Sequence, residues 1–174
     1  MKSNDEIYNG NYLPGSIIRE EGDFLYEQTL QQGDNSYSYV EVGSHSGAST
    51  TALLINIVKE NESRKVISID NCSYPEVNRE IFRNNLKQYG LLEPVEEVNT
   101  SSLEFDPRDN IYSIVFLDGD HTEGTVSKEI ELFDNHIAVG GIICGHDYQN
   151  FAGVTAAVDK FFEIKDLYYF KKIK

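Results

Sequence analysis

The sequence predicts an α/β fold: an open, mostly parallel sheet, doubly wound, with helices on both faces. Short runs rich in branched apolar residues, such as Val66–Ile69 and Ser113–Leu117, alternate with longer stretches of helical spacing. Runs of this composition are expected where both faces of a strand are covered. Four of the five runs end in polar or glycine-rich clusters, which parallel strands bring to one edge. Together these features predict a Rossmann-like architecture.

In chain order, residues 1–15 form an irregular lead-in, and residues 19–30 have apolar residues at the spacing of an amphipathic helix. Strands are predicted at Tyr37–Val42, Lys65–Asp70, Glu96–Asn99, Ile111–Asp118 and Gly141–Gly145. Helices are predicted at Ala48–Asn61, Glu76–Tyr89, Thr125–Asn135 and Thr155–Phe162. The tail predicts a short C-terminal antiparallel hairpin about Lys165-Asp166. No repeat or linker divides the chain, so residues 1–174 are predicted to form a single domain.

Composition narrows the classes of partner. The formal net charge of -14 repels phosphate backbones and anionic lipids, which disfavours nucleic acid and membranes. No apolar run approaches the roughly 18–20 residues of a membrane span, and the polar start Met1–Glu6 is unlike a signal peptide. A cytoplasmic protein with a small-molecule partner is the expectation. The two cysteines cannot form a disulfide framework.

The first predicted strand runs into Gly43-Ser-His-Ser-Gly47 and then into a helix. Glycine permits a tight turn and a close approach of the backbone to a ligand. The helix start beyond it, at Ser49, offers N–H groups to an anionic group. The spacing differs from the Gly-x-Gly-x-x-Gly of dinucleotide-binding turns. Alone, it fits an ordinary strand-to-helix turn equally well.

Two acids make this turn a candidate nucleoside site. Asp70 closes the second strand, where a carboxylate can accept hydrogen bonds from ribose hydroxyls. Its alternative role is a helix cap or a solvated turn. Glu41 lies at the mouth of the first strand, where an unpaired carboxylate is costly. A cationic ligand would provide its partner.

A second cluster follows the fourth and fifth strands, with Asp118, Asp120, His121, His146 and Asp147. Neighbouring acids repel one another unless they are protonated, paired or bound to a cation. Oxygen-rich sites suit Mg²⁺, Ca²⁺ or Mn²⁺, and a histidine shifts the preference toward transition metals. Alternatively, Asp120 and His121 cap the next helix and His146 is a core histidine with satisfied hydrogen bonds.

At these residues the chain resembles class I S-adenosylmethionine-dependent methyltransferases, in the small-molecule O-methyltransferase group. Glu41-Val-Gly-Ser-His-Ser-Gly-Ala-Ser-Thr50 is similar to their motif I, and Glu20-Glu-Gly-Asp-Phe-Leu-Tyr26 to the preceding helix. The resemblance implies that the cofactor is S-adenosylmethionine. It also implies cofactor contacts from the following residues: Glu41, Gly43, Ser44, Gly47, Ser49, Asp70 (ribose), Asn71 and Ser102 (adenine).

The segments Asp118-Gly-Asp-His-Thr-Glu-Gly124 and Gly140-Gly-Ile-Ile-Cys-Gly-His-Asp-Tyr148 are similar to those of macrolide-sugar and catechol-type O-methyltransferases. This resemblance implies a divalent cation, such as Mg²⁺, held by Asp118, His146 and Asp147 beside the acceptor hydroxyl. Position 146 departs from the pattern, since metal-dependent relatives commonly carry Asp or Glu there.

The expected reaction is methyl transfer to a hydroxyl of a small molecule. Asp118 would bind the metal or accept the proton, and His121 is the second candidate base because its unperturbed pKa lies near neutrality. Two alternatives remain: a hydroxylase-like, metal-dependent enzyme on the same fold, and a non-catalytic nucleoside-binding interaction module. The acceptor pocket could be open, could take a small acceptor, or could be closed by the second chain of a homodimer.

Overall fold

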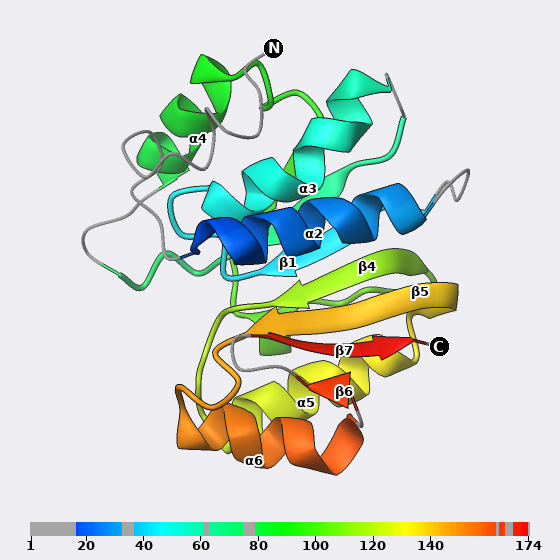
Figure 1. Cartoon of the computed structure of the whole chain (residues 1–174). Helices are drawn as coiled ribbons and strands as arrows, with labels where there is room; N and C mark the ends of the chain where they lie inside the picture. The colour runs from blue at the N-terminus through cyan, green and yellow to red at the C-terminus, as the bar shows by residue number, and fades with distance from the viewer. Residues whose placement is uncertain are drawn as a thin grey trace.

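The computed structural model describes residues 17–32, 37–60, 63–74, 79–162, 164–165 and 169–173. Its centre is a seven-stranded sheet in the order β3-β2-β1-β4-β5-β7-β6 (Figure 1). The strands are β1 (Tyr39–Val42), β2 (Val66–Ile69), β3 (Val95–Val98), β4 (Tyr112–Leu117), β5 (Ile137–His146), β6 (Ile164–Lys165) and β7 (Tyr169–Ile173). The first five pair in parallel, which confirms the predicted doubly wound α/β sheet.

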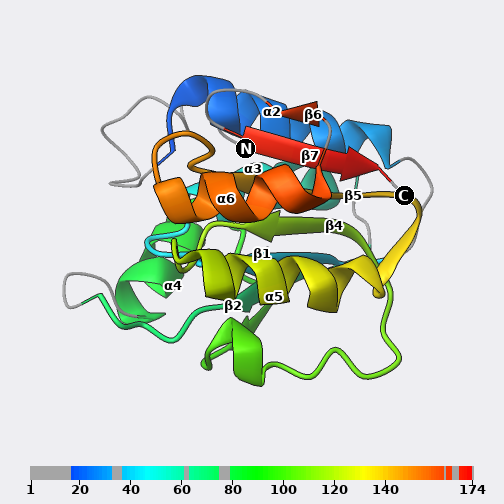
Figure 2. The same cartoon turned by 90° about the horizontal axis from the view of Figure 1, so that it is seen from below.

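Helices cover both faces of the sheet. The helices are α2 (Arg19–Gln31), α3 (Ala48–Lys59), α4 (Arg79–Gln88), α5 (Glu123–Asp134) and α6 (Ala152–Phe161), with a 3₁₀ turn η1 (Ser102–Glu104). The first three lie on one face, and α5 and α6 lie on the other (Figures 1 and 2). The sequence does not predict η1, and the predicted start of α4 and the lead-in 1–15 lie outside the described residues.

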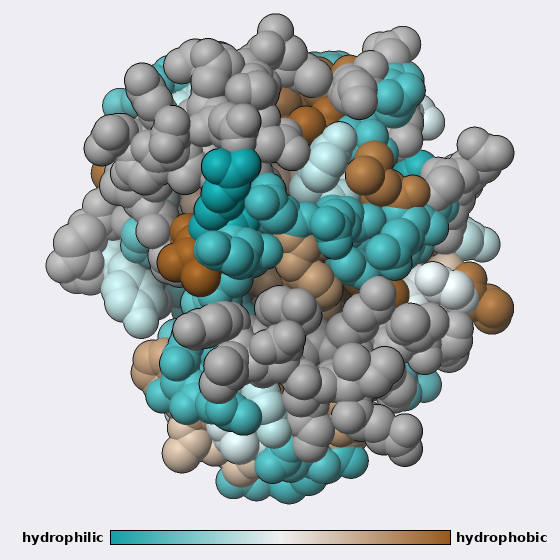
Figure 3. All heavy atoms as spheres, viewed as in Figure 1, coloured by the Kyte–Doolittle hydropathy of each residue, from teal (hydrophilic) through white to brown (hydrophobic). Residues whose placement is uncertain are grey.

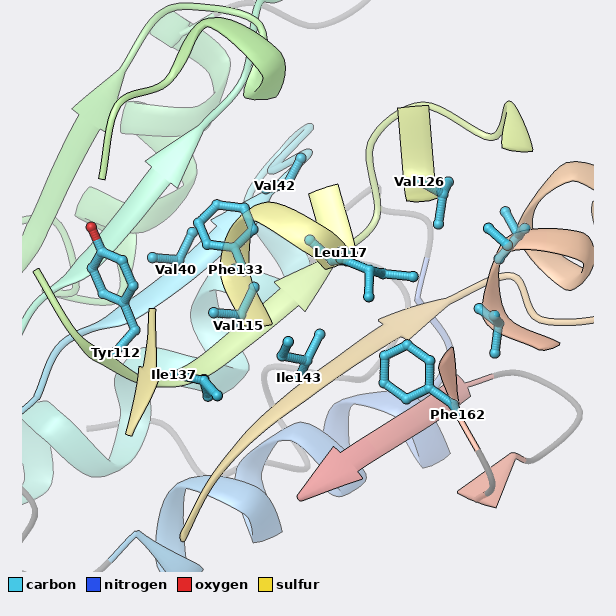
Figure 4. Close-up of a cluster of buried hydrophobic side chains, with 14 of the residues drawn as sticks. Val40, Val42, Tyr112, Val115, Leu117, Val126, Phe133, Ile137, Ile143 and Phe162 are labelled. Atoms are coloured by element: carbon cyan, nitrogen blue, oxygen red, sulfur yellow. The ribbon is translucent and has the colours of Figure 1, made fainter. Parts of the chain in front are cut away.

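Alternating strand side chains build a separate core on each face. On the face of α5 and α6, the valines and leucines of β1 and β4 pack with Phe133, Ile137 and Ile143 (Figure 4). The opposite core joins Tyr39, Ile114 and Phe116 to the apolar faces of α3 and α4. Because both faces of every central strand are buried, side chains with polar groups concentrate at the strand ends.

The fifth strand begins four residues earlier than predicted. Gly140 has a φ of +82° and the pairing with β4 shifts register between Tyr112 and Ile114, so residues 137–140 join the strand. Val139 is 91% exposed there, so this apolar residue does not pack into the core. Helix α6 also starts earlier, at Ala152 instead of Thr155.

The C-terminal strands run against the rest. β7 pairs antiparallel with β5, and β6 pairs antiparallel with β7. This is the direction that the predicted hairpin requires, although Asp166 at its turn lies outside the described residues. Within the described ranges, no helix combines the length and the apolar character needed to cross a bilayer.

Candidate functional site

One cavity of about 770 Å³ lies at the carboxyl ends of the parallel strands. Ligands of open α/β sheets bind at this edge, where loops from neighbouring strands diverge. Its lining comes from the loops after β1 to β5: Val42–His45, Asp70–Tyr74, Arg79, Thr100–Leu103, Asp118–His121, Thr125, His146 and Asp147. The cavity therefore joins the two predicted clusters, the glycine turn with Asp70 and the acids with their histidines, into one space.

The two glycines of the turn adopt positive φ angles, the conformation for which glycine was expected there. Gly43 has a φ of +82°, and a Cβ there would lie 2.1 Å from the carbonyl oxygen of Asp118. Gly47 has a φ of +96° and begins α3 against the ring of Phe82. Both positions need glycine, but only Gly43, with Ser44, lines the cavity.

Asp70 organises the turn. Its Oδ2 accepts hydrogen bonds from the backbone N–H groups of Ser44 and His45, both at 2.9 Å, and its Oδ1 accepts one from the N–H of Cys72 at 2.7 Å. A carboxylate offers about four acceptor positions, so Oδ1 retains room for one hydroxyl of a ligand. Asp70 thus lines the cavity, but it is not free to receive two ribose hydroxyls as simply as the sequence suggests.

The surroundings of Glu41 differ from the expectation that its carboxylate needs a cationic ligand as a partner. The side chain is fully buried beneath the turn and outside the cavity lining. The hydroxyls of Ser49 and Thr50 donate to its two carboxylate oxygens at 2.6 and 2.5 Å, so no cationic ligand is needed as a partner. Burial raises the pKa of Glu41 to about 7 against these two bonds. Glu41, Gly47 and Ser49 therefore support the turn from behind.

Asn71 and Ser102 lie on the side of the cavity formed by the loops after β2 and β3. Asn71 accepts a hydrogen bond from the N–H of Ser73 through Oδ1. The hydroxyl of Ser102 donates to Oε1 of Glu129, a buried acid on α5. Burial raises the pKa of Glu129 to about 7, and its Oε2 has no hydrogen-bond partner among the described residues.

Arg79 connects the elements on this side of the cavity through hydrogen bonds. No sequence pattern identified it. Its guanidinium donates to the hydroxyls of Ser44 and Ser68 and to the backbone carbonyls at the ends of β2 and β3, those of Ser68, Asp70 and Val98. One side chain therefore links the glycine turn to two neighbouring strands. A lone arginine at the start of a predicted helix carries no signal for this role.

The second cluster gathers at the ends of β4 and β5. Ligand atoms of Asp118, His121 and Asp147 all lie within 4.8 Å of one another. Opposite ligands of a Ca²⁺ or Mg²⁺ ion lie roughly 4–5 Å apart, so the donor set fits a divalent cation. Nε2 of His121 is buried and lies 2.9 Å from Asp147 Oδ2, but it makes no well-aligned hydrogen bond. A cation between these atoms would satisfy it.

His146 is not in this donor set, which differs in that residue from the predicted trio Asp118, His146 and Asp147. Its Nε2 lies 2.7 Å from Oε1 of Glu21, and its Nδ1 lies 3.3 Å from Oδ1 of Asp118 and from Oδ2 of Asp147. Burial lowers the pKa of His146, but the bonds to Asp118 and Glu21 outweigh burial and raise it to about 11. His146 thus lies among three acids, and His121 stands in the candidate donor set where the sequence predicts His146.

Burial raises the pKa of Asp118, and the charge and hydrogen bond of His146 oppose that rise. Asp147 has a φ of +64°, a left-handed conformation that is uncommon outside glycine and in which Asn, Asp and His are enriched. This turn directs its carboxylate back toward Asp118 and His121. Asp120 does not cap α5 as the alternative interpretation expects: its Oδ1 accepts from the N–H of Thr122, and Thr122 itself is the N-cap, with its side chain accepting from the N–H of Thr125.

Phe151 contacts the ring of His121, and the start of α6 contacts its backbone. The His121 ring stacks on Phe151 with ring centroids 4.0 Å apart and planes at 9°. A Cβ at Gly153 would lie 2.3 Å from the His121 carbonyl oxygen, so the start of α6 packs directly against this loop. Phe151 is 43% exposed and borders the open side of the cluster. The arrangement presents a fixed imidazole and two carboxylates to one end of the cavity.

Comparisons with known proteins bear on this arrangement. A family model described as a methyltransferase domain matches residues 40–148, which contain β1 to β5 and all three candidate cation ligands. No curated protein matches the chain.

The fold is similar to that of several solved structures. The O-methyltransferase NovP has a TM-score of 0.78 at 17% sequence identity, over 91% of this chain and 81% of that one. The S-adenosylhomocysteine-bound methyltransferase PaMTH1 of Podospora anserina has a TM-score of 0.68 at 13% identity, over 90% and 78%. CalS11, a TDP-rhamnose 3'-O-methyltransferase of calicheamicin biosynthesis, has a TM-score of 0.65 at 16% identity, over 87% and 77%. At these identities the likeness establishes the fold alone.

Proposed function

Since the chain belongs to the methyltransferase-domain family, whose model spans residues 40–148, we propose that it methylates a hydroxyl of a small molecule, using S-adenosylmethionine and a divalent cation. The single observation that carries the proposal is the continuous cavity. One end is formed by the glycine turn and Asp70, and the other by Asp118, His121 and Asp147. A methyl donor and an acceptor oxygen must meet in line, and one cavity with two chemically different ends suits that requirement.

The cofactor end matches the parts of S-adenosylmethionine. The tight turn at Gly43 lets the backbone approach the methionine portion, and Oδ1 of Asp70 retains an acceptor position for a ribose hydroxyl. Asn71 and Ser102 would border the adenine. A structural relative was solved with S-adenosylhomocysteine, the product of this cofactor, which supports the same ligand for this chain.

The acid end would hold the cation and the acceptor. Asp118, His121 and Asp147 are the three proposed ligands. When bound, a divalent cation makes a coordinated hydroxyl more acidic, so that its oxygen becomes a nucleophile near neutral pH. The carboxylate oxygen of Asp118 that does not hold the cation would then receive the hydroxyl proton, and His121 is the alternative base only where it is not a ligand. Stacking on Phe151 keeps the His121 imidazole in one orientation.

A small-molecule acceptor suits the charge of the chain. The net charge of -14 opposes the approach of a nucleic acid, and the acid cluster adds negative charge at the reacting end. On the face in Figure 3, the atoms of described residues are mostly hydrophilic, with apolar ones in separate spots. We therefore propose a soluble acceptor that carries a hydroxyl group, and this acceptor would enter beside Phe151.

Calorimetric titration with S-adenosylmethionine and S-adenosylhomocysteine, with and without Mg²⁺, tests the proposal. We expect both ligands to bind, and we expect Asp118→Ala to leave S-adenosylhomocysteine binding intact while it abolishes Mg²⁺ binding. Absence of nucleoside binding under every condition would overturn the proposal. Incubation with hydroxylated acceptors then separates methyl transfer from the alternatives, since only methyl transfer releases S-adenosylhomocysteine in proportion to a methylated product.

A further inference from the structure

A buried carboxylate reaches the acid cluster from the helix that precedes the first strand. Glu21 lies in the first turn of α2 and is 5% exposed. Its Oε1 lies 2.7 Å from Nε2 of His146, a residue 125 positions later in the chain. Its Oε2 accepts a hydrogen bond from the N–H of Ile18 at 2.8 Å. Both oxygens are therefore engaged, one by the helix start and one by the site.

The ring of His146 transmits this contact to two of the proposed cation ligands. Nδ1 lies 3.3 Å from an oxygen of Asp118 and 3.3 Å from an oxygen of Asp147. A rotation of the imidazole would therefore move against both carboxylates. His146, the last residue of β5, therefore lies between Glu21 of α2 on one side and Asp118 and Asp147 on the other.

The capping of α2 does not by itself explain why the side chain of Glu21 is buried. A cap needs one acceptor oxygen, and an exposed side chain can provide it. Burial of a carboxylate is unfavourable unless it is paired and hydrogen-bonded. The second oxygen of Glu21 meets a histidine whose other nitrogen faces the acid cluster, so the burial is explained by the contact with the site.

We propose that Glu21 is a positioning residue: it orients His146 and, through His146, fixes where Asp118 and Asp147 present their oxygens to a divalent cation. The inference rests on the proposed function, because it takes the cation site formed with His121 as given. Groups that hold metal ligands in place typically change metal affinity by about 10–100-fold when removed.

The substitution Glu21→Gln keeps the helix-capping hydrogen bond and changes only the contact with His146. The amide oxygen of glutamine still accepts from the N–H of Ile18, but its NH₂ group replaces the acceptor that faces His146. In Mn²⁺ titrations of the metal-free full chain by calorimetry, we expect Glu21→Gln to weaken binding roughly 10-fold or more. Glu20→Gln, an exposed neighbour on the same helix with the same change of charge, is the matched control and should bind Mn²⁺ as the wild type does.

A double substitution distinguishes action through His146 from loss of a negative charge. In a His146→Asn background, Glu21→Gln should cause no further loss of Mn²⁺ affinity. A loss there as large as in the wild-type background overturns the inference, as does unchanged Mn²⁺ binding by Glu21→Gln alone. If Glu21→Gln does not fold, Glu21→Asp replaces it: the shorter side chain keeps the charge but cannot reach both partners, and it is expected to weaken Mn²⁺ binding similarly.

S-adenosylhomocysteine binding separates this inference from the proposed function. Glu21 does not line the cavity, so the variants changed at Glu21 alone should bind S-adenosylhomocysteine as the wild type does. A wild-type chain that binds Mn²⁺, with Glu21→Gln unaffected, overturns the positioning role alone. A wild-type chain that binds S-adenosylhomocysteine but no Mn²⁺ overturns the cation part of the proposed function and the positioning role with it.

Discussion

Replacement of Glu41 by glutamine measures what a buried carboxyl does to the stability of this fold. Glu41 is fully buried in β1 and receives hydrogen bonds from Ser49 and Thr50. Burial raises its pKa from the ordinary 4.5 to about 7. Glutamine has nearly the same shape, and rotation of one hydroxyl allows both hydrogen bonds to be kept without an ionisable group.

The sign and size of the effect follow from the pKa in the two states. Between about pH 4.5 and 7 the folded chain keeps the Glu41 proton, whereas the unfolded chain has released it. The unfolded state then binds fewer protons, so the free energy of unfolding falls as pH rises through this window. The full difference corresponds to about 3 kcal/mol, as an order of magnitude. The substitution Glu41→Gln removes this fall in the free energy of unfolding.

Urea denaturation of both proteins at pH 5 and pH 8 provides the measurement. We expect the wild type to lose about 3 kcal/mol more than Glu41→Gln between these two values. Other titrating groups, including His146, contribute equally to both proteins and cancel in the comparison. Glu20→Gln, which removes an exposed carboxyl from α2, should follow the wild type. Parallel stability curves for the wild type and Glu41→Gln would refute the argument, since they would mean that Glu41 is ionised in the fold.

Three further outcomes are expected. Gly43→Ala should destabilise the fold by about 2–4 kcal/mol in urea denaturation and abolish S-adenosylhomocysteine binding, because its Cβ meets the backbone of the loop after β4. Gly90→Ala, at a φ of +68° with open space around it, should lose only about 1 kcal/mol, and equal losses would contradict the steric argument. Asp70→Asn should weaken S-adenosylhomocysteine binding roughly 10-fold in calorimetry, since an NH₂ group replaces one acceptor oxygen of the turn; unchanged affinity would count against its role. Glu129→Gln should raise the thermal midpoint at pH 8 but not at pH 5, because burial raises the pKa of Glu129 to about 7, and a shift of equal size at both values would exclude that cause.

Much of the fold could be predicted because each central strand is buried on both faces. Val66–Ile69 and Tyr112–Leu117 are mostly apolar and buried at every position, and polar residues directly after them mark the site edge. Gly43, Asp70 and Asp118 were found in this way, since a residue that follows a parallel strand must lie at the ligand-binding edge.

The site residues that the sequence did not predict depend on contacts between distant segments, which periodicity does not encode. Glu21 and Glu129 lie on helices, where a buried acid resembles a cap or a solvated residue until its partner is known. The exchange of His146 for His121 among the candidate cation ligands has a local cause. The backbone at Asp147 takes a positive φ, which turns its carboxylate toward His121, and no spacing rule predicts that turn.

The contact between Gly43 and the backbone of Asp118 has a consequence for protein engineering. The glycine turn and the loop after β4 meet there through main-chain atoms alone, so no side chain at this contact can be enlarged or trimmed. A library that varies residue 43 would alter both ends at once and would return mostly inactive variants. Residues 72–74 and Leu103 also line the cavity, and they can be randomised without touching this contact. Acceptor preference and cofactor preference are therefore best evolved from such lining side chains, with the main-chain contact left unchanged.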